Sequence, residues 1–189
     1  MIGFAMTGSH CTLSAALRGM EALASLGYEL QPIMSESVYS TDTRFFEAKR
    51  LCDRVEEICK REIIHTVRDA EPLGPSKPLE YLIIAPTTGN TLAKLAGGIT
   101  DTAVTMAAKA HLRCDRPLLL AVASNDAASQ NLGNLARVIT RRSVYLVPMR
   151  QDDPTSKPHS LVADFGRLVE CFEAMQRGVQ LRPMFIYYG

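Results

Sequence analysis

The sequence predicts an α/β protein with a doubly wound, mainly parallel sheet flanked by helices. Short apolar runs with the length of buried strands, such as residues 82–86 and 117–123, alternate with longer segments whose apolar residues have helical spacing. This alternation is typical of a parallel sheet covered by helices. The chain has 189 residues, 47% of them hydrophobic, which suits one domain with a full core. We expect that domain to span residues 1–178, followed by a C-terminal tail at 179–189.

The amino-terminal part is expected to begin with a strand at residues 2–6, followed by the turn TGSH at 7–10. Apolar residues at helical spacing then predict a helix at 13–26. It ends before Gly27, a residue type that favours helix C-termini. The following segments are expected to be, in order, a strand at 28–34, a charged helix at 43–61, a strand at 63–67 and a turn-rich loop at 70–78.

The carboxyl-terminal part repeats the alternation, with strands expected at 81–85, 118–123 and 144–147. A helical pattern at 91–111 is interrupted by the pair Gly97-Gly98. The remaining segments are expected to be a helix at about 127–141, a polar loop at 151–159 and a closing amphipathic helix, capped by Ser160 and ended by Gly178.

Composition excludes several classes of function. The 21 Lys and Arg residues nearly balance the 20 Asp and Glu residues, for a formal net charge of +1, so no basic stripe marks a nucleic-acid binder. No apolar run reaches the roughly 18 residues of a membrane span, and we expect no targeting segment. The five cysteines include no Cys-x-x-Cys pair, so we expect free thiols, no metal site and a reducing, cytoplasmic location.

Small polar residues follow four of the expected strands. These strand-end loops are Thr7-Gly8-Ser9, Ser35-Glu36-Ser37, the run PTTGNT at 86–91, and Ala123-Ser124-Asn125-Asp126. The carboxyl ends of parallel strands lie at one edge of a sheet, which is where ligands bind. Any single Ser or Thr before a helix is most often an ordinary cap. Four such loops together favour a phosphate-bearing, ring-containing ligand held by neutral donors and helix N-termini.

Two residues are candidates for catalytic roles. Asn90 stands just before Thr91, and if Thr91 caps the next helix, the Asn90 amide is available to a ring edge or a carboxylate of a ligand. His10 lies in the first strand-end loop, where it can titrate or bind a ligand, although a lone loop histidine is as often a solvated bystander. The other three histidines are expected to be structural or without a partner: His65, His111 and His159.

Known nucleotide-binding patterns are absent. The first turn supplies Gly8 alone of the Gly-x-Gly-x-x-Gly dinucleotide pattern, although Glu36 stands where the ribose-binding acid would, and no P-loop lysine motif occurs. Neither paired carboxylates nor a cluster with metal-ligand spacing is present. We therefore expect a bound cofactor to supply the chemistry.

The segment PTTGNTLAKLAGGITDT at 86–102, together with Thr7-Gly8-Ser9, resembles the flavoprotein family of homo-oligomeric flavin-containing cysteine decarboxylases. The family pattern Pro-x-Ser-x-Asn-Thr-x-x-Lys-x-x-x-Gly-x-x-Asp is matched at Pro86, Thr88, Asn90, Thr91, Lys94, Gly98 and Asp101, with Thr88 in place of the usual Ser. The Ala-Pro-Ala-Met-Asn segment of the family is matched by AVASN at 121–125. This segment keeps the Asn, as Asn125, but lacks the Pro and the Met. The resemblance extends to residue 178 and implies a Rossmann-like flavoprotein fold.

The resemblance also implies FMN at the subunit interface of a homo-oligomer, a trimer or a dodecamer of stacked trimers. Gly8 and Ser9 would line the flavin, and Asn90 would face its ring system or the substrate. Four further residues would contact the phosphate or ribityl oxygens or assist those contacts: Ser35, Thr87, Thr88 and Thr91. The loop Ser124-Asn125 would border the substrate pocket.

The activity implied by the resemblance depends on a histidine. Decarboxylating members carry a catalytic His in a His-x-x-Leu setting after the second strand, whereas residues 36–62 contain no His. This departure favours the branch of the family that oxidises dihydrodipicolinate to dipicolinate (pyridine-2,6-dicarboxylate) in sporulating bacteria. In that branch a separate A subunit with a nicotinamide-binding fold, and NADP held by it, is the implied partner. Two alternatives stay open: a flavin-dependent decarboxylase or flavin prenyltransferase, and a non-catalytic scaffold or activator of the A subunit.

A dicarboxylate substrate requires at least one cationic side chain in the site. The loops after the first and fifth expected strands, at 7–9 and 123–126, contain no Lys or Arg. We expect the cation to come from Lys94, from Arg150 or from a neighbouring subunit.

Overall fold

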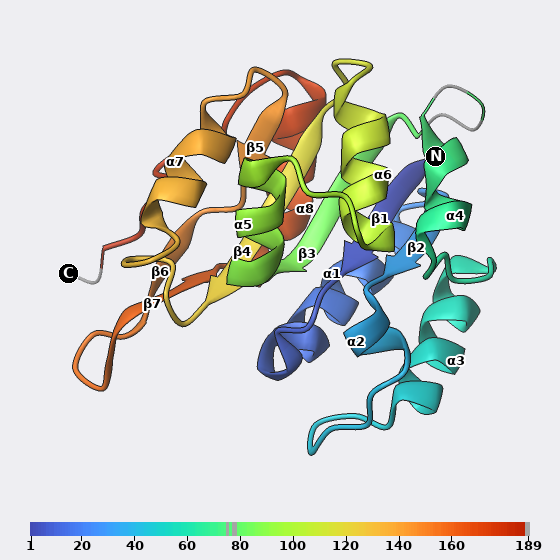
Figure 1. Ribbon diagram of the computed structural model, residues 1–189, viewed down its shortest axis with the longest axis horizontal. Coiled ribbons are helices and arrows are strands. Elements are labelled where there is room, and N and C mark those ends of the chain that lie inside the picture. The colour runs from blue at the N-terminus through green and yellow to red at the C-terminus, as the bar shows by residue number, and fades with distance from the viewer. Residues whose placement is uncertain (75, 77–78, 188–189) are drawn as a thin grey trace.

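The computed structural model describes residues 1–74, 76 and 79–187 (Figure 1). Its centre is a sheet with five parallel strands, whose bounds are β1 Ile2–Met6, β2 Leu30–Met34, β3 Tyr81–Thr87, β4 Leu118–Ser124 and β5 Val144–Leu146. Two antiparallel strands, β6 Met149–Asp153 and β7 Lys157–Ala163, extend the sheet. The order is β2-β1-β3-β4-β7-β6, with β5 paired to β4. The predicted fold class is confirmed.

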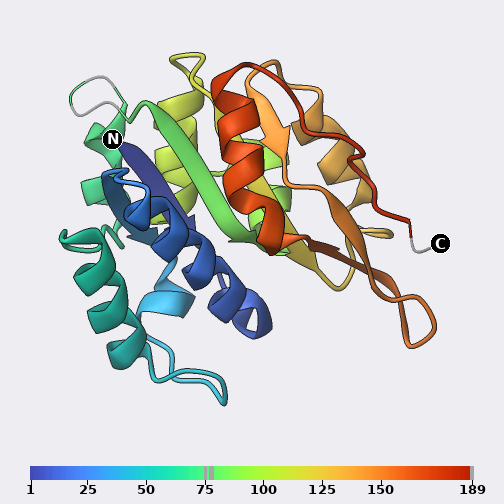
Figure 2. The same cartoon turned by 180° about the vertical axis from the view of Figure 1, so that it is seen from behind.

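Strand β4 has two different neighbours on the side away from β3. Its first half, residues 118–120, pairs with β5 in parallel. Its second half, Ala123 and Ser124, pairs with Val162 and Leu161 of β7 in antiparallel orientation. The β6–β7 hairpin is therefore attached at the carboxyl end of β4 and projects beyond the sheet (Figures 1 and 2).

Helices cover both faces of the sheet. Figure 2 shows one face with α1 Leu13–Ser25, α3 Ala48–Cys59 and α8 Leu168–Gln176, and Figure 1 shows the other with α4 Val67–Ala70, α5 Gly89–Gly97, α6 Ala103–Leu112 and α7 Leu132–Ile139. The short α2 (Glu36–Tyr39) follows β2. Three 3₁₀ turns complete the elements: η1 His10–Thr12, η2 Glu71–Leu73 and η3 Phe165–Arg167.

Side chains of each parallel strand alternate between two cores, because successive residues of a strand point to opposite faces. Phe4 and Ile83 are buried with Phe172 on the α1/α8 face. Ala5 and Ile84 are buried with the helices of the α5/α6 face. Both faces of the central strands are covered, which explains their continuous apolar runs.

The third predicted strand, at 63–67, is wrong. Ile64 makes only an isolated bridge with Ile33, and the chain then enters α4 at Val67. Thr66 caps that helix, because its hydroxyl accepts a hydrogen bond from the Asp69 amide at 3.1 Å. The predicted loop at 70–78 includes the end of α4 and η2, while residues 75, 77 and 78 lie outside the described residues.

The polar loop predicted at 151–159 and the helix cap predicted at Ser160 are also wrong. These residues form the β6–β7 hairpin, whose turn is stabilised by Asp153: its carboxylate accepts hydrogen bonds from the amides of Thr155 and Ser156. Leu161 and Ala163 are buried with a spacing of two, which is the period of a strand. The closing helix, α8, begins later, at Leu168.

The segment after α8 lies along the edge of the sheet. The Gln180 side chain accepts a hydrogen bond from the Leu146 amide and donates one to the Leu146 carbonyl, both at 2.8 Å. Farther along, Phe185 forms a parallel bridge with Met149 at the start of β6. In the described part of the chain, no helix combines the length and the apolar character that a membrane crossing requires.

His111 is fully buried near the end of α6. Its Nε2 atom lies 2.8 Å from the Pro117 carbonyl oxygen, and its Nδ1 atom has no hydrogen-bond partner among the described residues. Burial lowers the pKa of His111 from 6.5 to about 4. The residue is therefore neutral near pH 7 and has a structural role.

The low pKa of His111 predicts loss of stability in mild acid. The unfolded chain binds a proton at a pKa near 6.5 and the folded chain only near 4, so the stabilisation is complete above pH 6.5 and is lost as pH falls towards 4. The expected loss is up to about 3 kcal/mol. Urea unfolding at a series of pH values measures it. His111→Gln should flatten the pH dependence, and His159→Gln, at an exposed histidine, should leave it unchanged.

Candidate functional site

Residues at the carboxyl ends of β1, β3 and β4 and residues of the β6–β7 hairpin line a cavity of about 710 Å³, which we call the strand-end cavity. Its size is that of a cofactor or drug-sized ligand site. Of the predicted site residues, those that line it are Gly8, Ser9, His10, Thr88, Asn90, Ser124 and Asn125. The three that do not line it are Ser35, Thr87 and Thr91.

The loop after β1 is joined to the loop after β3 by the buried Thr7 side chain. The Thr7 hydroxyl donates to the Pro86 carbonyl oxygen at 2.7 Å and accepts from the Thr88 amide at 3.1 Å. Next to it, a Cβ atom on Gly8 would lie 3.0 Å from the Ser37 hydroxyl oxygen and 3.5 Å from His10 Nε2. The absence of a side chain at Gly8 therefore lets the loop after β1 pack closely against Ser37.

Ser9 and His10 continue the cavity wall from Gly8 into η1. The Thr12 hydroxyl donates to the Ser9 carbonyl and lies 2.9 Å from the Ser9 hydroxyl, so this short turn is fixed by its own side chains. His10 is partly exposed, which leaves its ring accessible to a ligand.

Thr88, not Thr91, caps helix α5. The Thr88 hydroxyl accepts from the Thr91 amide at 3.2 Å, and the two hydroxyl oxygens are 2.9 Å apart. The buried Thr87 hydroxyl donates to the Ile84 carbonyl at 2.7 Å. Thr87 and Thr91 thus face protein. Asn90, in the first turn of α5, is exposed at the cavity, and within the described part of the chain its amide has no hydrogen-bond partner.

A polar cluster follows β4. The Asp126 carboxylate accepts hydrogen bonds from the Ser124 hydroxyl at 2.5 Å and from Asn131 Nδ2 at 2.9 Å. This turn delays α7, which begins at Leu132, although a start at about 127 was predicted. A Cβ atom on Gly89 would lie only 2.5 Å from the Ser124 hydroxyl oxygen and 2.7 Å from Asp126 Oδ1. The cluster therefore packs directly against the backbone at the start of α5.

Ser35 lies beside the cavity and not in its wall. Its carbonyl accepts from the amides of Val38 and Tyr39 at the start of α2, and its hydroxyl is 3.1 Å from the Ser37 hydroxyl. Ser37 in turn faces Gly8. The loops after β1 and β2 are thus in contact through small side chains.

Four residues of the cavity wall were not among the site residues predicted from the sequence. Arg44 and Phe45 belong to an irregular segment that was predicted to be helical, and the Arg44 guanidinium lies 4.8 Å from the centre of the Phe45 ring. Lys157 and Asp152 come from the β6–β7 hairpin and form an ion pair at 2.6 Å. The Asp152 carboxylate raises the pKa of Lys157, so this lysine is charged.

The cations proposed from the sequence lie elsewhere. Lys94 donates to both carboxylate oxygens of Asp101, at 2.8 and 2.9 Å, and does not line the strand-end cavity. Arg150 does not line it either, and instead borders a cleft between β6 and the C-terminal segment. Arg44 and Lys157 are the cationic side chains that the structure places in the cavity wall.

The histidines are separated in space. His65 is stacked on Tyr39, with ring centres 3.7 Å apart, and does not line the cavity. His159 is exposed on β7 and also lies outside the cavity wall. Within the described residues, His10 is therefore the one histidine available to a ligand in the strand-end cavity.

Comparison with known proteins identifies similar chains. A family model described as Flavoprotein matches residues 1–172. The B subunit of dipicolinate synthase from Bacillus subtilis (strain 168) is 41% identical over 185 residues, which cover 98% of this chain and 92% of that protein. The crystal structure of the corresponding B subunit from Bacillus halodurans has 39% identity and a TM-score of 0.90, with coverage of 100% of this chain and 96% of that one.

More distant solved structures share the fold alone. A dodecameric FMN-dependent Ubix-like decarboxylase from Escherichia coli O157:H7 has 20% identity and a TM-score of 0.68, over 100% of both chains. This likeness confirms the predicted fold, a mainly parallel sheet flanked by helices.

The packing of Gly89 predicts that Gly89→Ala destabilises the protein. The added methyl group would overlap the Ser124 and Asp126 oxygens, so the polar cluster must shift, at a cost of about 1–3 kcal/mol. Denaturant unfolding measures the loss. Gly97→Ala, in the same helix, would meet only Ile99 at 3.8 Å and should be neutral or stabilising. Equal stability of the two variants would contradict the role of Gly89.

Proposed function

Because this chain belongs to the flavoprotein family, we propose that it binds FMN in the strand-end cavity and acts as the flavin-binding B subunit of a dipicolinate synthase. The observation that carries the proposal is the 41% identity to the Bacillus subtilis protein over nearly the whole chain. We further propose that it contributes to the oxidation of dihydrodipicolinate to dipicolinate in the cytoplasm of a sporulating cell.

The residues of the cavity fit the chemical character of FMN. Gly8 lines the cavity and has no side chain, so a flat ring system can approach its backbone closely. The hydroxyls of Ser9 and Thr88 and the first turn of α5 offer neutral donors to phosphate or ribityl oxygens. We propose that Ser35 contributes to the same donor set from its position behind Gly8. Thr87 and Thr91 would act by holding the Thr88 loop in place.

The substrate would lie at the hairpin side of the cavity. A dicarboxylate needs cationic partners, and the cavity wall contains Arg44 and Lys157, of which Lys157 is already paired with Asp152. Asn90 would orient the substrate ring or the flavin with its free amide, and Ser124-Asn125 would form the border of the substrate pocket.

Aromatisation of dihydrodipicolinate removes two electrons and two protons from its ring, as one hydride equivalent and one proton. A bound flavin supplies a two-electron acceptor. We propose that His10 takes one ring proton at an imidazole nitrogen, since it is the histidine at the cavity. NADP held by the partner, the A subunit of dipicolinate synthase, is the proposed final acceptor of the electrons.

Two further proposals concern assembly and reaction type. Phe45 lines the cavity and is 45% exposed, and we propose that a neighbouring copy in a trimer or dodecamer covers it and completes the wall. Cysteine decarboxylation is the less supported reaction, because His65 is stacked on Tyr39 and the segment after β2 offers no histidine to the cavity.

The cofactor proposal predicts a coloured protein. Purified protein, or protein mixed with FMN and freed of excess, should show a flavin absorption spectrum. Asn90→Ala should raise the dissociation constant of FMN or of pyridine-2,6-dicarboxylate by about fivefold or more, because a hydrogen bond to the ligand is lost. Gln130→Ala, which removes an exposed carboxamide outside the cavity, is the control. Protein that neither retains nor binds FMN would overturn the proposal.

The substrate proposal predicts a loss of dicarboxylate binding on removal of the two cavity cations. The double variant Arg44→Gln, Lys157→Gln should bind pyridine-2,6-dicarboxylate about tenfold more weakly in calorimetric titration. The matched control is Lys60→Gln, Arg177→Gln, which removes one lysine and one arginine charge from exposed positions outside the cavity. Equal affinity of both double variants would contradict this placement of the substrate.

The role of the chain beside the A subunit requires a separate assay. Formation of dipicolinate is measured with only the A subunit present, with this chain added, and with Asn90→Ala added. Turnover that needs this chain and falls with Asn90→Ala supports a catalytic role. Turnover that is restored equally by wild-type and Asn90→Ala protein, with or without FMN, supports a non-catalytic activator.

A further inference from the structure

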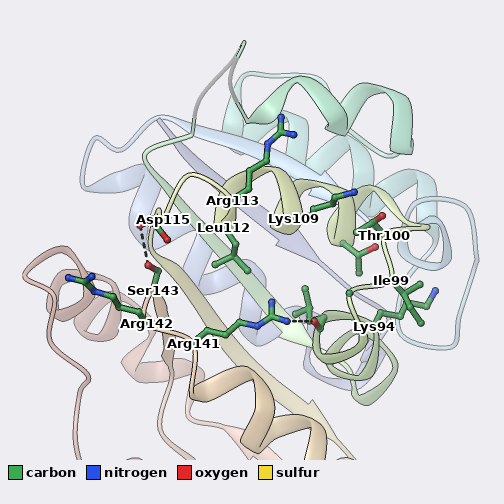
Figure 3. A pocket seen from close by; sticks show the side chains of 13 residues that line it. Lys94, Ile99, Thr100, Lys109, Leu112, Arg113, Asp115, Arg141, Arg142 and Ser143 are labelled. Atoms are coloured by element: carbon green, nitrogen blue, oxygen red, sulfur yellow. Dashed lines mark hydrogen bonds between the residues drawn. The ribbon is translucent and has the colours of Figure 1, made fainter.

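A second cavity, of about 570 Å³, lies between the carboxyl ends of α5, α6 and α7 (Figure 3). It shares no lining residue with the strand-end cavity. Asp115 and Ser143 in its wall precede β4 and β5, so it opens at the opposite edge of the sheet. We call it the basic cavity.

The wall of the basic cavity concentrates positive charge. One carboxylate, that of Asp115, is accompanied by the cationic side chains of Lys94, Lys109, Arg113, Arg141 and Arg142. The whole chain has a formal net charge of only +1. The balance of charges in the sequence therefore hides a strongly uneven distribution on the surface.

Two of these cations have partners within the protein. Lys94 is paired with Asp101, and Arg141 donates to the Leu95 carbonyl at the end of α5 at 3.0 Å. Cations near helix C-termini also compensate the helix dipole, and Arg141 has that role here. Lys109, Arg113 and Arg142 form no ion pair with any residue that the structure describes.

The interior of the basic cavity is apolar. Leu95 and Leu112 contribute to it, and Ile99 is 50% exposed at its margin. In Figure 3 the Arg141 side chain reaches across the cavity towards α5, Leu112 lies between Arg141 and α6, and Lys109 and Arg113 project from α6. Thr100 and Ser143 add hydroxyl groups. An apolar floor with cationic groups at the margin favours a ligand that has a flat ring and a multivalent anionic group.

We propose that the basic cavity is a binding site for a nucleoside phosphate. The ring would lie against Leu112 and Ile99, and the phosphates would contact Lys109 and Arg113 at the end of α6. Arg142 points away from these two side chains in Figure 3. The volume lies in the range of small-molecule sites. This site is independent of the proposed flavin site, because the two lie at opposite edges of the sheet and have separate walls.

Calorimetric titration of the full chain with ADP tests the proposal. ADP should bind, and its affinity should fall as KCl is raised, because the contacts are with partly exposed charges. Adenosine, which lacks the charge, should not bind detectably, and pyrophosphate, which lacks the ring, should bind more weakly than ADP. The double variant Lys109→Gln, Arg113→Gln should raise the dissociation constant of ADP about tenfold or more. Arg141 is left in place because it also holds the end of α5.

Two controls locate the site. Lys60→Gln, Arg177→Gln removes one lysine and one arginine charge outside the basic cavity and should leave ADP binding unchanged. Lys157→Gln alters only the strand-end cavity and should also leave it unchanged. Absence of ADP binding, or wild-type affinity in Lys109→Gln, Arg113→Gln, would overturn the proposal. So would a loss of affinity in Lys157→Gln, or pyrophosphate binding as tight as that of ADP. None of these results would affect the flavin spectrum.

Discussion

The buried hydroxyl of Thr7 is the contact on which the geometry of the strand-end cavity depends. Backbone pairing between β1 and β3 extends only to Ala5 and Ile84. Beyond that point the two strands are joined by the Thr7 hydroxyl, which donates a hydrogen bond to the Pro86 carbonyl and accepts one from the Thr88 amide. It thereby fixes the residue that caps α5, and the orientation of that helix follows from the cap.

From Thr88 the same kind of contact continues around the cavity. Gly89 packs against the polar cluster of Ser124 and Asp126, and Ser160 of the β6–β7 hairpin donates to the Ser124 carbonyl at 3.3 Å. Neighbouring loops are thus joined by side chains where regular pairing ends. Small polar residues at this edge have two kinds of position, some facing protein and some facing the cavity, and their order in the sequence does not distinguish them.

The sequence predicted those parts of the fold in which burial is continuous. Strands β1, β3 and β4 are almost entirely buried and mostly apolar, and the predicted loops at their carboxyl ends lie together as expected. The β6–β7 hairpin was missed because its exposed half is polar and Leu161, Phe165 and Leu168 also have helical spacing. Arg44 and Lys157 were missed for a different reason. Each reaches the cavity from a distant segment, and only the tertiary fold relates them to it.

The two hydrogen bonds between Gln180 and Leu146 have a consequence for association between chains. Strand β5 pairs with β4 on one side, so its other side is an edge, and free backbone groups at an edge can pair with a foreign strand. The carboxamide of Gln180 occupies the amide and the carbonyl of Leu146 as a neighbouring strand would. A single side chain from the C-terminal segment thus protects a three-residue strand against edge-to-edge aggregation.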